Sequence, residues 1–457
     1  MDILRQIIKD RNRVVLEGIE DKYRSDSLGR LVGHPDALVF PSSSEEVSSI
    51  MRHAYAQGIP VTPRGAGTNL SGSTVPSRGG IVLDLSRMNQ ILELDRENSI
   101  ITVEPGVLLC DLQAYVEERG FFYPPDPGEK LSTIGGNIAT NAGGMRAVKY
   151  GVTRDYVRGL EVVWPNGDIS NLGGKVVKDS SGLSLKHLLI GSEGTLGIIT
   201  KCTLKLIPKP AFSLSVLIPF ASLREGIDNV LKVIQENANP TAVEFVERSV
   251  IALGEDFLGL QFPCPDADSY ILLTFDGSSE SEIRSSIEKV RRVSLENHAL
   301  GFLLLEDREV AENVWKIRGA LVKAVESISE QEPMDIVVPI SRIAAYIAYV
   351  NALQAETGVR MISFGHAGDG NVHICVMREQ MDDETWEKKL DHVVTLLYDK
   401  SLELEGLPSG EHCIGITKKD HFERVTYPVN ISLMRSVKLA FDDRNILNAG
   451  KIFTSLS

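Results

Sequence analysis

The sequence predicts a two-domain α+β protein, and three observations support this prediction. The chain has 457 residues, which is more than one ordinary core needs and suggests two or three domains. Glycine-rich loops and short strand-like runs fill the chain up to about residue 210. Beyond Pro208 and Pro210, apolar strands alternate with longer helices, as in a doubled β-α-β unit. We therefore expect domains at residues 1–211 and 212–414, with residues 415–457 returning to the first domain.

The composition is that of an ordinary globular protein. Hydrophobic residues make up 43% and charged residues 24% of the chain. The formal net charge of −14 argues against a nucleic-acid partner and leaves open whether the acidic surface serves solubility or attracts a basic protein. The absence of a signal peptide and of a long apolar run predicts a cytoplasmic protein without a transmembrane segment. No C-x-x-C motif is present, so neither a disulfide framework nor an iron–sulfur cluster is expected among Cys110, Cys202, Cys264, Cys375 and Cys413.

The first domain is expected to be mainly β structure after a polar, helical lead-in at residues 1–33. Ser43 and Glu46 are spaced as a capping box ahead of a helix that ends at Gln57. Short apolar runs bounded by turn residues predict the strands. These are residues 37–41, 59–63, 80–85, 101–106, 160–168 and 197–207.

The second domain is expected to contain a doubled ferredoxin-like sheet, because strands and amphipathic helices alternate in two similar halves. The predicted strands are residues 213–220, 241–247, 270–275, 301–306 and 335–339. The predicted helices are residues 222–236, 279–294, 309–326 and 341–356.

A glycine-rich loop, PRGAGTNLSG at residues 63–72, directly follows a predicted strand. Its glycines would let backbone amides approach an anion closely. The spacing is not the G-x-G-x-x-G of dinucleotide-binding helices, since Leu70 occupies the third glycine position. Taken alone, the loop is either a phosphate cradle or an ordinary glycine-rich turn.

Two later segments have the same character. Residues 124–151 (PPDPGEKLSTIGGNIATNAGGMRAVKYG) and 190–200 (IGSEGTLGIIT) interleave glycines with hydroxyl and amide side chains. Small and polar residues in three separated loops suit a long, polar ligand that lies across the domain.

The segment SFGHAGDGNVHICV, residues 363–376, predicts a β-hairpin that carries two histidines. The Asp369-Gly370 dipeptide favours a two-residue type I′ turn, which would pair residue 368 with 371 and His366 with His373. Directly opposed side chains have Cβ atoms ~5 Å apart, close enough for two imidazoles to share a metal ion. The alternative is that both histidines lie on a sheet surface without a ligand.

The segment SGEHCIG, residues 409–415, places a carboxylate and an imidazole side by side at Glu411 and His412. Two histidines and one carboxylate form a divalent-metal site with open positions, suited to Zn²⁺ or Fe²⁺.

With these motifs in order, the chain from about residue 34 onward resembles the flavin-binding family of vanillyl-alcohol oxidase and the D-2-hydroxy-acid dehydrogenases. Within it, the resemblance is closest to the branch of D-lactate dehydrogenase and the glycolate oxidase large subunit. The resemblance implies a vanillyl-alcohol oxidase type FAD-binding domain and a substrate domain that covers the flavin. Thr68 stands where covalent members often carry histidine, so non-covalent FAD is expected. The implied FAD-binding residues are Pro63, Arg64, Gly65, Ala66, Gly67, Thr68, Asn69, Gly72, Pro127, Thr133, Gly135, Gly136, Asn137, Thr140, Asn141, Gly143, Gly144, Tyr150, Gly151, Glu193, Gly197, Ile198, Ile199 and Asn448.

The resemblance also implies roles at the reacting centre. His366, His373 and Glu411 would be metal ligands and His412 the base. Arg318 matches the arginine that clamps the substrate carboxylate, although on its own helix it reads equally well as a surface charge.

Three departures from the family pattern bear on function. Pro333 stands where the hydroxyglutarate branch carries a lysine, and Cys375 where it carries an asparagine. Both changes favour a short monocarboxylate over a dicarboxylate. Cys413 replaces the usual glycine after the Glu-His pair, so the backbone is strained if it has positive φ there.

The function implied is oxidation of D-lactate or glycolate to the 2-oxo acid, with the hydride passing to flavin and an external electron acceptor taking the electrons. An electron-transferring flavoprotein is the expected acceptor, and a homodimer is left open. One alternative is a flavin-carrying electron-transfer subunit, and another is an oxidase that uses oxygen. An NAD-dependent dehydrogenase is disfavoured by the missing fingerprint.

Overall fold

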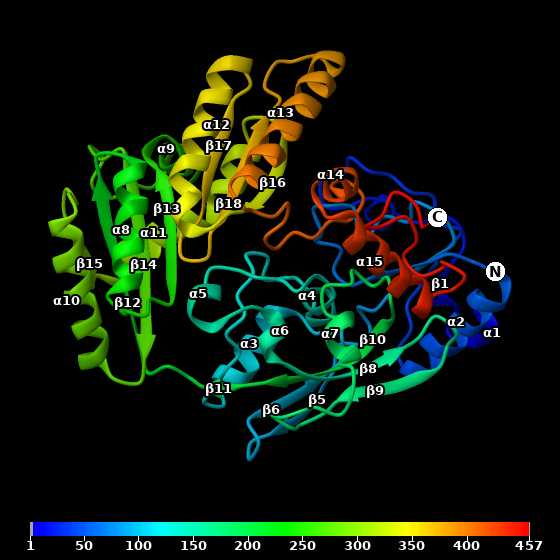
Figure 1. Cartoon of the computed structure of the whole chain (residues 1–457). Coiled ribbons are helices and arrows are strands. Elements are labelled where there is room, and N and C mark those ends of the chain that lie inside the picture. Colours follow the sequence, from blue (N-terminus) through cyan, green and yellow to red (C-terminus); the bar gives the residue numbers. More distant parts are fainter. Residues whose placement is uncertain (1–2, 457) are drawn as a thin grey trace. The chain divides into compact units, whose positions relative to one another are not determined.

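The computed structural model describes residues 3–456, which form two compact units. Unit 1 contains the chain up to Gly143, then Val152–Lys209, and the segment from Glu411 onward. Unit 2 contains Gly144–Gly151 and Pro210–Gly410. Figure 1 colours the chain along its sequence, so the blue and red ends can both be followed within unit 1.

The first sheet of unit 1 has the order β1-β2-β4-β3, with β4 parallel to both β2 and β3. Its strands are β1 (Val14–Val15), β2 (Ala37–Val39), β3 (Val61–Arg64) and β4 (Ile81–Asp84). Helix α2 (Ser44–Gln57) begins as expected, because the Ser43 side chain accepts from the backbone of Glu46. The Glu46 carboxylate accepts from Ser42 N instead of closing the box on Ser43.

The second sheet of unit 1 is antiparallel, with the order β5-β6-β10-β8-β9. Its strands are β5 (Ile91–Asp95), β6 (Ile100–Val103), β8 (Val157–Val163), β9 (Ile169–Gly173) and β10 (Ile198–Lys205). A pair of short strands, β7 (Phe121–Phe122) and β11 (Ile207–Pro208), lies apart from it. Besides α2 and a short N-terminal helix, the helices of this unit are α3 (Leu109–Glu117), α4 (Ile134–Thr140), α6 (Thr153–Tyr156), α7 (Leu185–Leu189), α14 (Lys419–Val425) and α15 (Pro428–Phe441).

The expectation of a helical lead-in at residues 1–33 is wrong. Helix α1 (Leu4–Ile7) spans four residues, and two 3-10 turns follow it. Val14 and Val15 then pair with β2 as a strand. Tertiary pairing therefore overrides the weak local helix signal in this segment.

Unit 2 is built on one antiparallel sheet, whose order is β15-β12-β14-β13-β17-β18-β16. Its first half contains β12 (Phe212–Phe220), α8 (Leu223–Gln235), β13 (Ala242–Glu247), β14 (Ser269–Gly277), α10 (Glu280–Glu296) and β15 (Leu303–Leu305). The order of these strands is fourth, first, third, second, which is the ferredoxin-like arrangement. The α+β class and the ferredoxin-like unit predicted from the sequence are confirmed.

The second half repeats this arrangement up to its last strand. It contains β16 (Gln331–Val337), α12 (Ile343–Thr357), β17 (Met361–His366), β18 (Asn371–Met377) and α13 (Asp383–Glu403). Strand β17 joins the two halves by pairing with β13. In place of a fourth strand beside β16, Leu407 makes an isolated antiparallel bridge to Val337.

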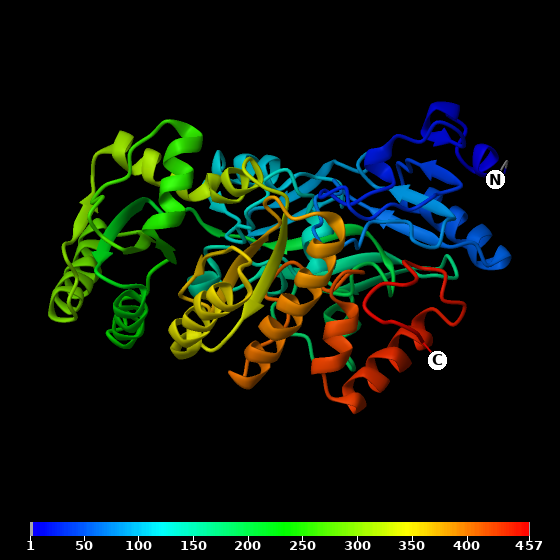
Figure 2. The same ribbon diagram turned by 90° about the horizontal axis from the view of Figure 1, so that it is seen from above.

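Helices cover both faces of this sheet. Buried side chains of α8, α10, α12 and α13 form one core, and those of α9 (Arg248–Leu258) and α11 (Arg308–Glu326) form the core of the opposite face. Neighbouring residues of a strand contribute to opposite cores, as Val216 and Leu217 do in β12. Helices α12 and α13, yellow and orange, run side by side in both views (Figure 1, Figure 2).

A short helix, α5 (Ala147–Tyr150), belongs to unit 2 although the glycine-rich segment on either side of it belongs to unit 1. Its Tyr150 hydroxyl donates to the Asp276 carboxylate at 2.7 Å. Within residues 3–456, no helix is long and apolar enough to cross a membrane.

Candidate active site

The predicted histidine hairpin forms, but its register differs from the prediction. His366 pairs with Asn371 and Phe364 with His373, so residues 367–370 make a four-residue loop between β17 and β18. The prediction of a type I′ turn is wrong. That turn needs positive φ at both central residues, Asp369 and Gly370, and only Gly370 has it, at +87°. The pairing is shifted by two residues, and a shift of two leaves every side chain on its expected face.

The two histidines therefore still meet within unit 2. Their Nε2 atoms are 3.3 Å apart, and their ring centroids are 5.1 Å apart at nearly a right angle. Diagonal neighbours on one sheet face lie within reach of ring-sized side chains. The geometry confirms that the two imidazoles converge.

The Nδ1 atom of His366 contacts a carboxylate that the sequence analysis did not identify. Glu244 of β13 is fully buried and lies directly across from His366 in the sheet register. Its Oε1 atom is 2.6 Å from His366 Nδ1. Burial acts to raise the pKa of Glu244, but the charges of His366 and Arg318 outweigh it and lower that pKa.

Arg318 of α11 is buried rather than a surface charge. Its Nη2 atom pairs with Oε2 of Glu244, and its guanidinium carbon lies 5.2 Å from the centre of the Phe364 ring. Among the described residues, no hydrogen-bond acceptor reaches its Nε atom. Glu244 thus contacts both Arg318 and His366.

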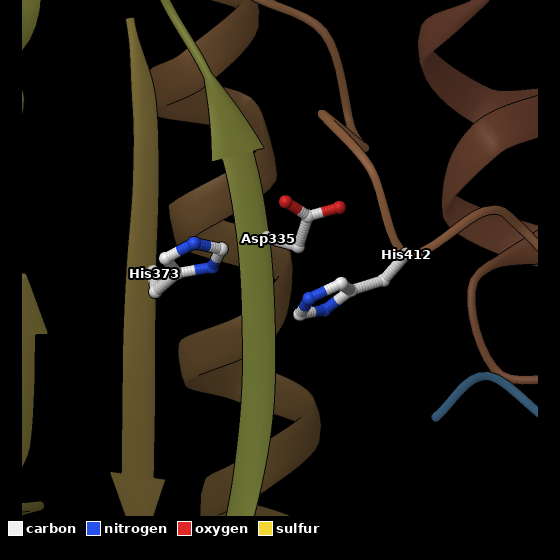
Figure 3. Close-up of side chains that lie close together, drawn as sticks. All are labelled: Asp335, His373 and His412. Carbon is white, nitrogen blue, oxygen red and sulfur yellow. The ribbon is translucent and has the colours of Figure 1, made fainter. Parts of the chain in front are cut away.

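A second carboxylate organises the chain on the other side of the hairpin. Asp335 of β16 is fully buried and pairs with His373 in the strand register, and Figure 3 shows both side chains on their strands. Its Oδ1 atom accepts from Asn371 Nδ2 at 2.8 Å. Its Oδ2 atom accepts from Ser409 Oγ at 2.8 Å and from Gly410 N at 3.0 Å. Asp335 therefore holds residues 409 and 410 along β16, where a fourth strand would otherwise run.

Glu411 and His412 follow immediately and belong to unit 1. Glu411 Oε1 is 3.7 Å from His412 Nε2. A Cβ atom placed on Gly143 would lie 3.1 Å from Glu411 Oε2, so this carboxylate rests against the glycine-rich segment after α4. The His412 carbonyl accepts from Ser71 Oγ at 3.0 Å. Glu411 and His412 thus contact two of the predicted cofactor loops.

Cys413 has the positive φ that the sequence analysis named as a source of backbone strain. Its φ is +68°, in the left-handed region that favours glycine. Its Sγ atom lies 3.4 Å from the Thr140 carbonyl. The cysteine therefore combines an unfavourable φ with a contact to the end of α4.

Replacing Cys413 by glycine is expected to stabilise unit 1 by about 1 kcal/mol, because the left-handed conformation costs a residue with a Cβ atom about that much. The urea midpoint should rise at an unchanged m-value. Cys413→Ala is the matched control, since alanine loses the thiol and keeps the strain. A glycine variant no more stable than the alanine variant would contradict the prediction.

The loop after β3 is tightly built. Gly65 is required for close approach, because a Cβ atom there would collide with Oγ1 of Thr133. Thr133 itself caps α4 by accepting from Gly136 N at 3.2 Å. The Arg64 guanidinium donates to the carbonyl of Lys22 at 2.6 Å and to Oγ1 of Thr74 at 3.2 Å, so it anchors the loop from within the protein.

Glu193 ties several of these segments together. Its carboxylate accepts from Ile414 N and Gly415 N, both at 2.9 Å, and from the Ser73 hydroxyl. Burial raises the pKa of Glu193. The Asn448 side chain donates to the Glu193 carbonyl at 2.7 Å and to the Ser73 carbonyl at 3.0 Å. The Glu193 side chain therefore connects Ser73, which directly follows the first glycine-rich loop, to the segment that follows the Glu-His pair.

The other predicted cofactor residues fall into four groups. Gly144, Tyr150 and Gly151 lie in unit 2. The remainder lie in unit 1. In β3 and the loop after it are Pro63, Ala66, Gly67, Thr68, Asn69 and Gly72; on α4 and its flanking loops are Pro127, Gly135, Asn137, Thr140 and Asn141; just before and at the start of β10 are Gly197, Ile198 and Ile199.

Sequence reasoning missed Glu244 and Asp335. Each is a charged residue inside a mostly apolar strand segment, Glu244 in AVEFVE and Asp335 in PMDIVV. A charge in such a run must be paired when the strand is buried, so this signal was available in the sequence. It does not identify the partner.

Two protein families match the chain. Residues 35–173 match the FAD binding domain family, and residues 209–452 match the family of FAD linked oxidases, C-terminal domain. The two matches together include the predicted loops at residues 63–72 and 124–151, the histidine hairpin and the Glu-His pair.

Several curated proteins are similar to this chain over nearly the full length. D-lactate dehydrogenase of Anaerostipes hadrus is 44% identical over 424 residues, which cover 92% of this chain and 89% of the relative. The glycolate oxidase subunit GlcD of Bacillus subtilis is 38% identical over 434 residues, covering 94% of this chain and 92% of the relative. D-lactate dehydrogenase of Archaeoglobus fulgidus is 38% identical, covering 95% of this chain and 96% of the relative.

Solved structures share the fold at low sequence identity. A p-cresol methylhydroxylase superposes with a TM-score of 0.81 at 18% identity, covering 98% of this chain and 95% of that one. The 4-ethylphenol oxidase of Gulosibacter chungangensis gives a TM-score of 0.78 at 19% identity, with coverage of 98% and 95%. These matches confirm the expected vanillyl-alcohol oxidase type of fold. The chain therefore belongs to the family of FAD-linked oxidases and is an FAD-dependent oxidoreductase.

Proposed function

We propose that this enzyme oxidises a short D-2-hydroxy acid, D-lactate or glycolate, to the 2-oxo acid. The names of the relatives, D-lactate dehydrogenase and glycolate oxidase, support this substrate class. The observation that carries the proposal is the convergence of His366 and His373, with Nε2 atoms 3.3 Å apart. Such a pair beside a buried arginine suits a substrate that has a hydroxyl and a carboxylate on adjacent carbons.

The glycine-rich loops would hold FAD non-covalently, and bound FAD supplies the hydride acceptor of its isoalloxazine ring. Gly65 and its neighbours would wrap the pyrophosphate, with Thr133, Gly136 and Thr140 along the flavin and ribityl chain. The packing of Gly65 against Thr133 supports this role, because a backbone without a Cβ atom leaves the amides open to a phosphate.

Replacing Gly65 by alanine is expected to weaken FAD binding at least tenfold, which corresponds to about 1.4 kcal/mol. The added methyl group would displace Thr133 and the loop with it. Reconstitution of the apoprotein with FAD, followed by flavin fluorescence, measures the affinity. Gly128→Ala is the control, since no atom lies within 4 Å of a Cβ there. Equal affinities for the two variants would contradict the role of Gly65.

His366, His373 and Glu411 would hold a divalent cation, Zn²⁺ or Fe²⁺. Two imidazole nitrogens and a carboxylate oxygen are donors that suit these metals. Glu411 is bonded to Gly410, so its Cα lies ~3.8 Å from that of Gly410, and Asp335 holds Gly410 on β16, the strand next to His373. This covalent connection supports Glu411 as the third ligand. The cation would supply Lewis acidity that makes the substrate hydroxyl easier to deprotonate.

His412 would accept the hydroxyl proton, and Arg318 would bind the substrate carboxylate. A histidine is suited to accept a proton near neutral pH. Arg318 keeps N–H groups beyond the one that pairs with Glu244, including an Nε that no described residue accepts. A guanidinium offers donors in a fork that matches a carboxylate.

A monocarboxylate is the favoured substrate because β16 and β18 carry no cation at two positions. These are the positions where the family's dicarboxylate branch has polar side chains. Pro333 and Cys375 lie directly opposite each other on β16 and β18. Cys375 is buried, which raises the pKa of its thiol to about 12 and keeps it neutral. Neither side chain can pair with a second carboxylate.

The test is anaerobic titration of the FAD-loaded enzyme with D-lactate, L-lactate, glycolate and D-2-hydroxyglutarate, together with metal analysis of the same sample. We expect D-lactate or glycolate to bleach the flavin in one equivalent, and we expect about one metal ion per chain. A flavin that none of these acids reduces would overturn the proposal.

Reoxidation would then define the acceptor. We infer that electrons pass to an external protein, an electron-transferring flavoprotein, in the cytoplasm. The five free cysteines fit a reducing compartment. Reoxidation by oxygen with formation of peroxide would instead identify an oxidase.

A further inference from the structure

One buried carboxylate contacts both a metal-ligand candidate and the arginine assigned to the substrate. Glu244 Oε1 is 2.6 Å from His366 Nδ1, and Glu244 Oε2 pairs with Arg318. The three residues come from β13, β17 and α11. Glu244 is fully buried. A buried carboxylate without partners would be strongly disfavoured, so Glu244 needs both contacts.

The sheet register explains why Glu244 faces His366. The two residues are directly paired between β13 and β17, so their side chains leave the same face of the sheet. Glu244 therefore depends on backbone pairing for its contact with the histidine, and on the packing of α11 for its contact with Arg318.

The contact at Nδ1 determines how the imidazole is presented. An ionised carboxylate can only accept, so Nδ1 of His366 carries the hydrogen in this contact. The lone pair of the neutral ring is then on Nε2, which is the atom that faces His373 at 3.3 Å. A carboxylate behind a metal-bound histidine fixes the tautomer and the ring orientation in this way.

We propose that Glu244 is a shared positioning residue: one oxygen keeps Nε2 of His366 directed at the metal, and the other orients Arg318 for the substrate carboxylate. This inference rests on the proposed function, because it needs His366 as a ligand and Arg318 as the clamp. It adds that the two are coupled through one side chain. Loss of the negative charge should therefore weaken metal binding and substrate binding together.

Glu244→Gln is the decisive variant. Glutamine keeps the size of the side chain but replaces one carboxylate oxygen by an NH₂ group, which donates. The contacts to His366 and Arg318 use different oxygens of Glu244, so glutamine cannot keep both in place. The matched control is Glu255→Gln, which removes the charge from another ion pair of unit 2, with Arg248 at 2.6 Å. Glu255 lies on α9 and contacts neither histidine.

Three measurements apply to the FAD-loaded protein. Competition with a chromophoric chelator gives the Zn²⁺ affinity, which we expect to fall 10- to 100-fold in Glu244→Gln. Steady-state kinetics should show a rise in KM for D-lactate. Selective ¹⁵N-histidine NMR of the zinc-free protein should show that His366 loses its pure Nδ1–H tautomer. Glu255→Gln should leave all three unchanged.

The outcomes separate this inference from the proposed function. If the wild-type protein binds no Zn²⁺, or if His373→Asn does not abolish its Zn²⁺ binding, the proposed metal site is wrong. The NMR measurement then still tests the contact between Glu244 and His366. If Glu244→Gln keeps the wild-type Zn²⁺ affinity and the wild-type His366 tautomer, the positioning role of Glu244 is wrong, whether or not the metal takes part in the reaction. Should Glu244→Gln fail to fold, Glu244→Asp, which withdraws the carboxylate by one methylene group, is read by the same criteria.

Discussion

Replacing His412 by asparagine is expected to slow flavin reduction by D-lactate about 10²- to 10⁴-fold, because the hydroxyl proton then loses its proposed acceptor. Hydride leaves C2 only as this proton leaves, so the whole step should slow. FAD content should stay unchanged, since it is the His412 carbonyl, not its ring, that accepts from Ser71 in the first glycine-rich loop.

Anaerobic stopped-flow measurement of flavin bleaching gives this rate directly. His34→Asn, at an exposed histidine of unit 1, is the control and should reduce its flavin at the wild-type rate. A His412 variant within threefold of wild type at neutral pH would show that another group takes the proton.

Removal of the proposed metal ion is the second change for which we expect a large effect. His373→Asn should bind less than a tenth of an equivalent of metal and should reduce its flavin at least about a thousandfold more slowly. A bound divalent cation lowers the pKa of coordinated water from 15.7 to ~7, and an alcohol in the same position should respond similarly. Without the cation, the hydroxyl proton is too tightly held for a histidine to remove at neutral pH.

Chelation of the wild-type enzyme should reproduce the effect, and stoichiometric Zn²⁺ or Fe²⁺ should reverse it. His392→Asn, at an exposed position of α13, controls for loss of a histidine in the same unit. Full activity in a preparation with no detectable metal would remove the cation from the mechanism, and the role of His366 and His373 would need another explanation.

The histidine hairpin shows how far pattern reasoning reaches. The dipeptide Asp369-Gly370 predicted a two-residue turn, but the hairpin formed with a four-residue loop and a register shifted by two residues. His366 and His373 still converge because strand side chains alternate with a period of two. The face of a strand residue is thus predictable when its direct partner is not.

The repeat in unit 2 shows a related limit. Alternating strands and helices predicted a doubled ferredoxin-like sheet. The sequence did not reveal that the second copy lacks its last strand, where Leu407 makes an isolated bridge to Val337. Nor did it predict α9, which packs against α11 on the opposite face.

The sequence by itself determined the glycine-rich loops, most of the strands and the histidines of the site, because loop glycines and apolar periodicity are patterns within a few neighbouring residues. Only the tertiary structure decided which groups meet. Glu244 is 122 residues from His366 and 74 from Arg318, and Asp335 is 75 from Gly410. Hydrogen bonds across such separations depend on strand order and register, which arise from the packing of the whole sheet and leave no local pattern in the chain.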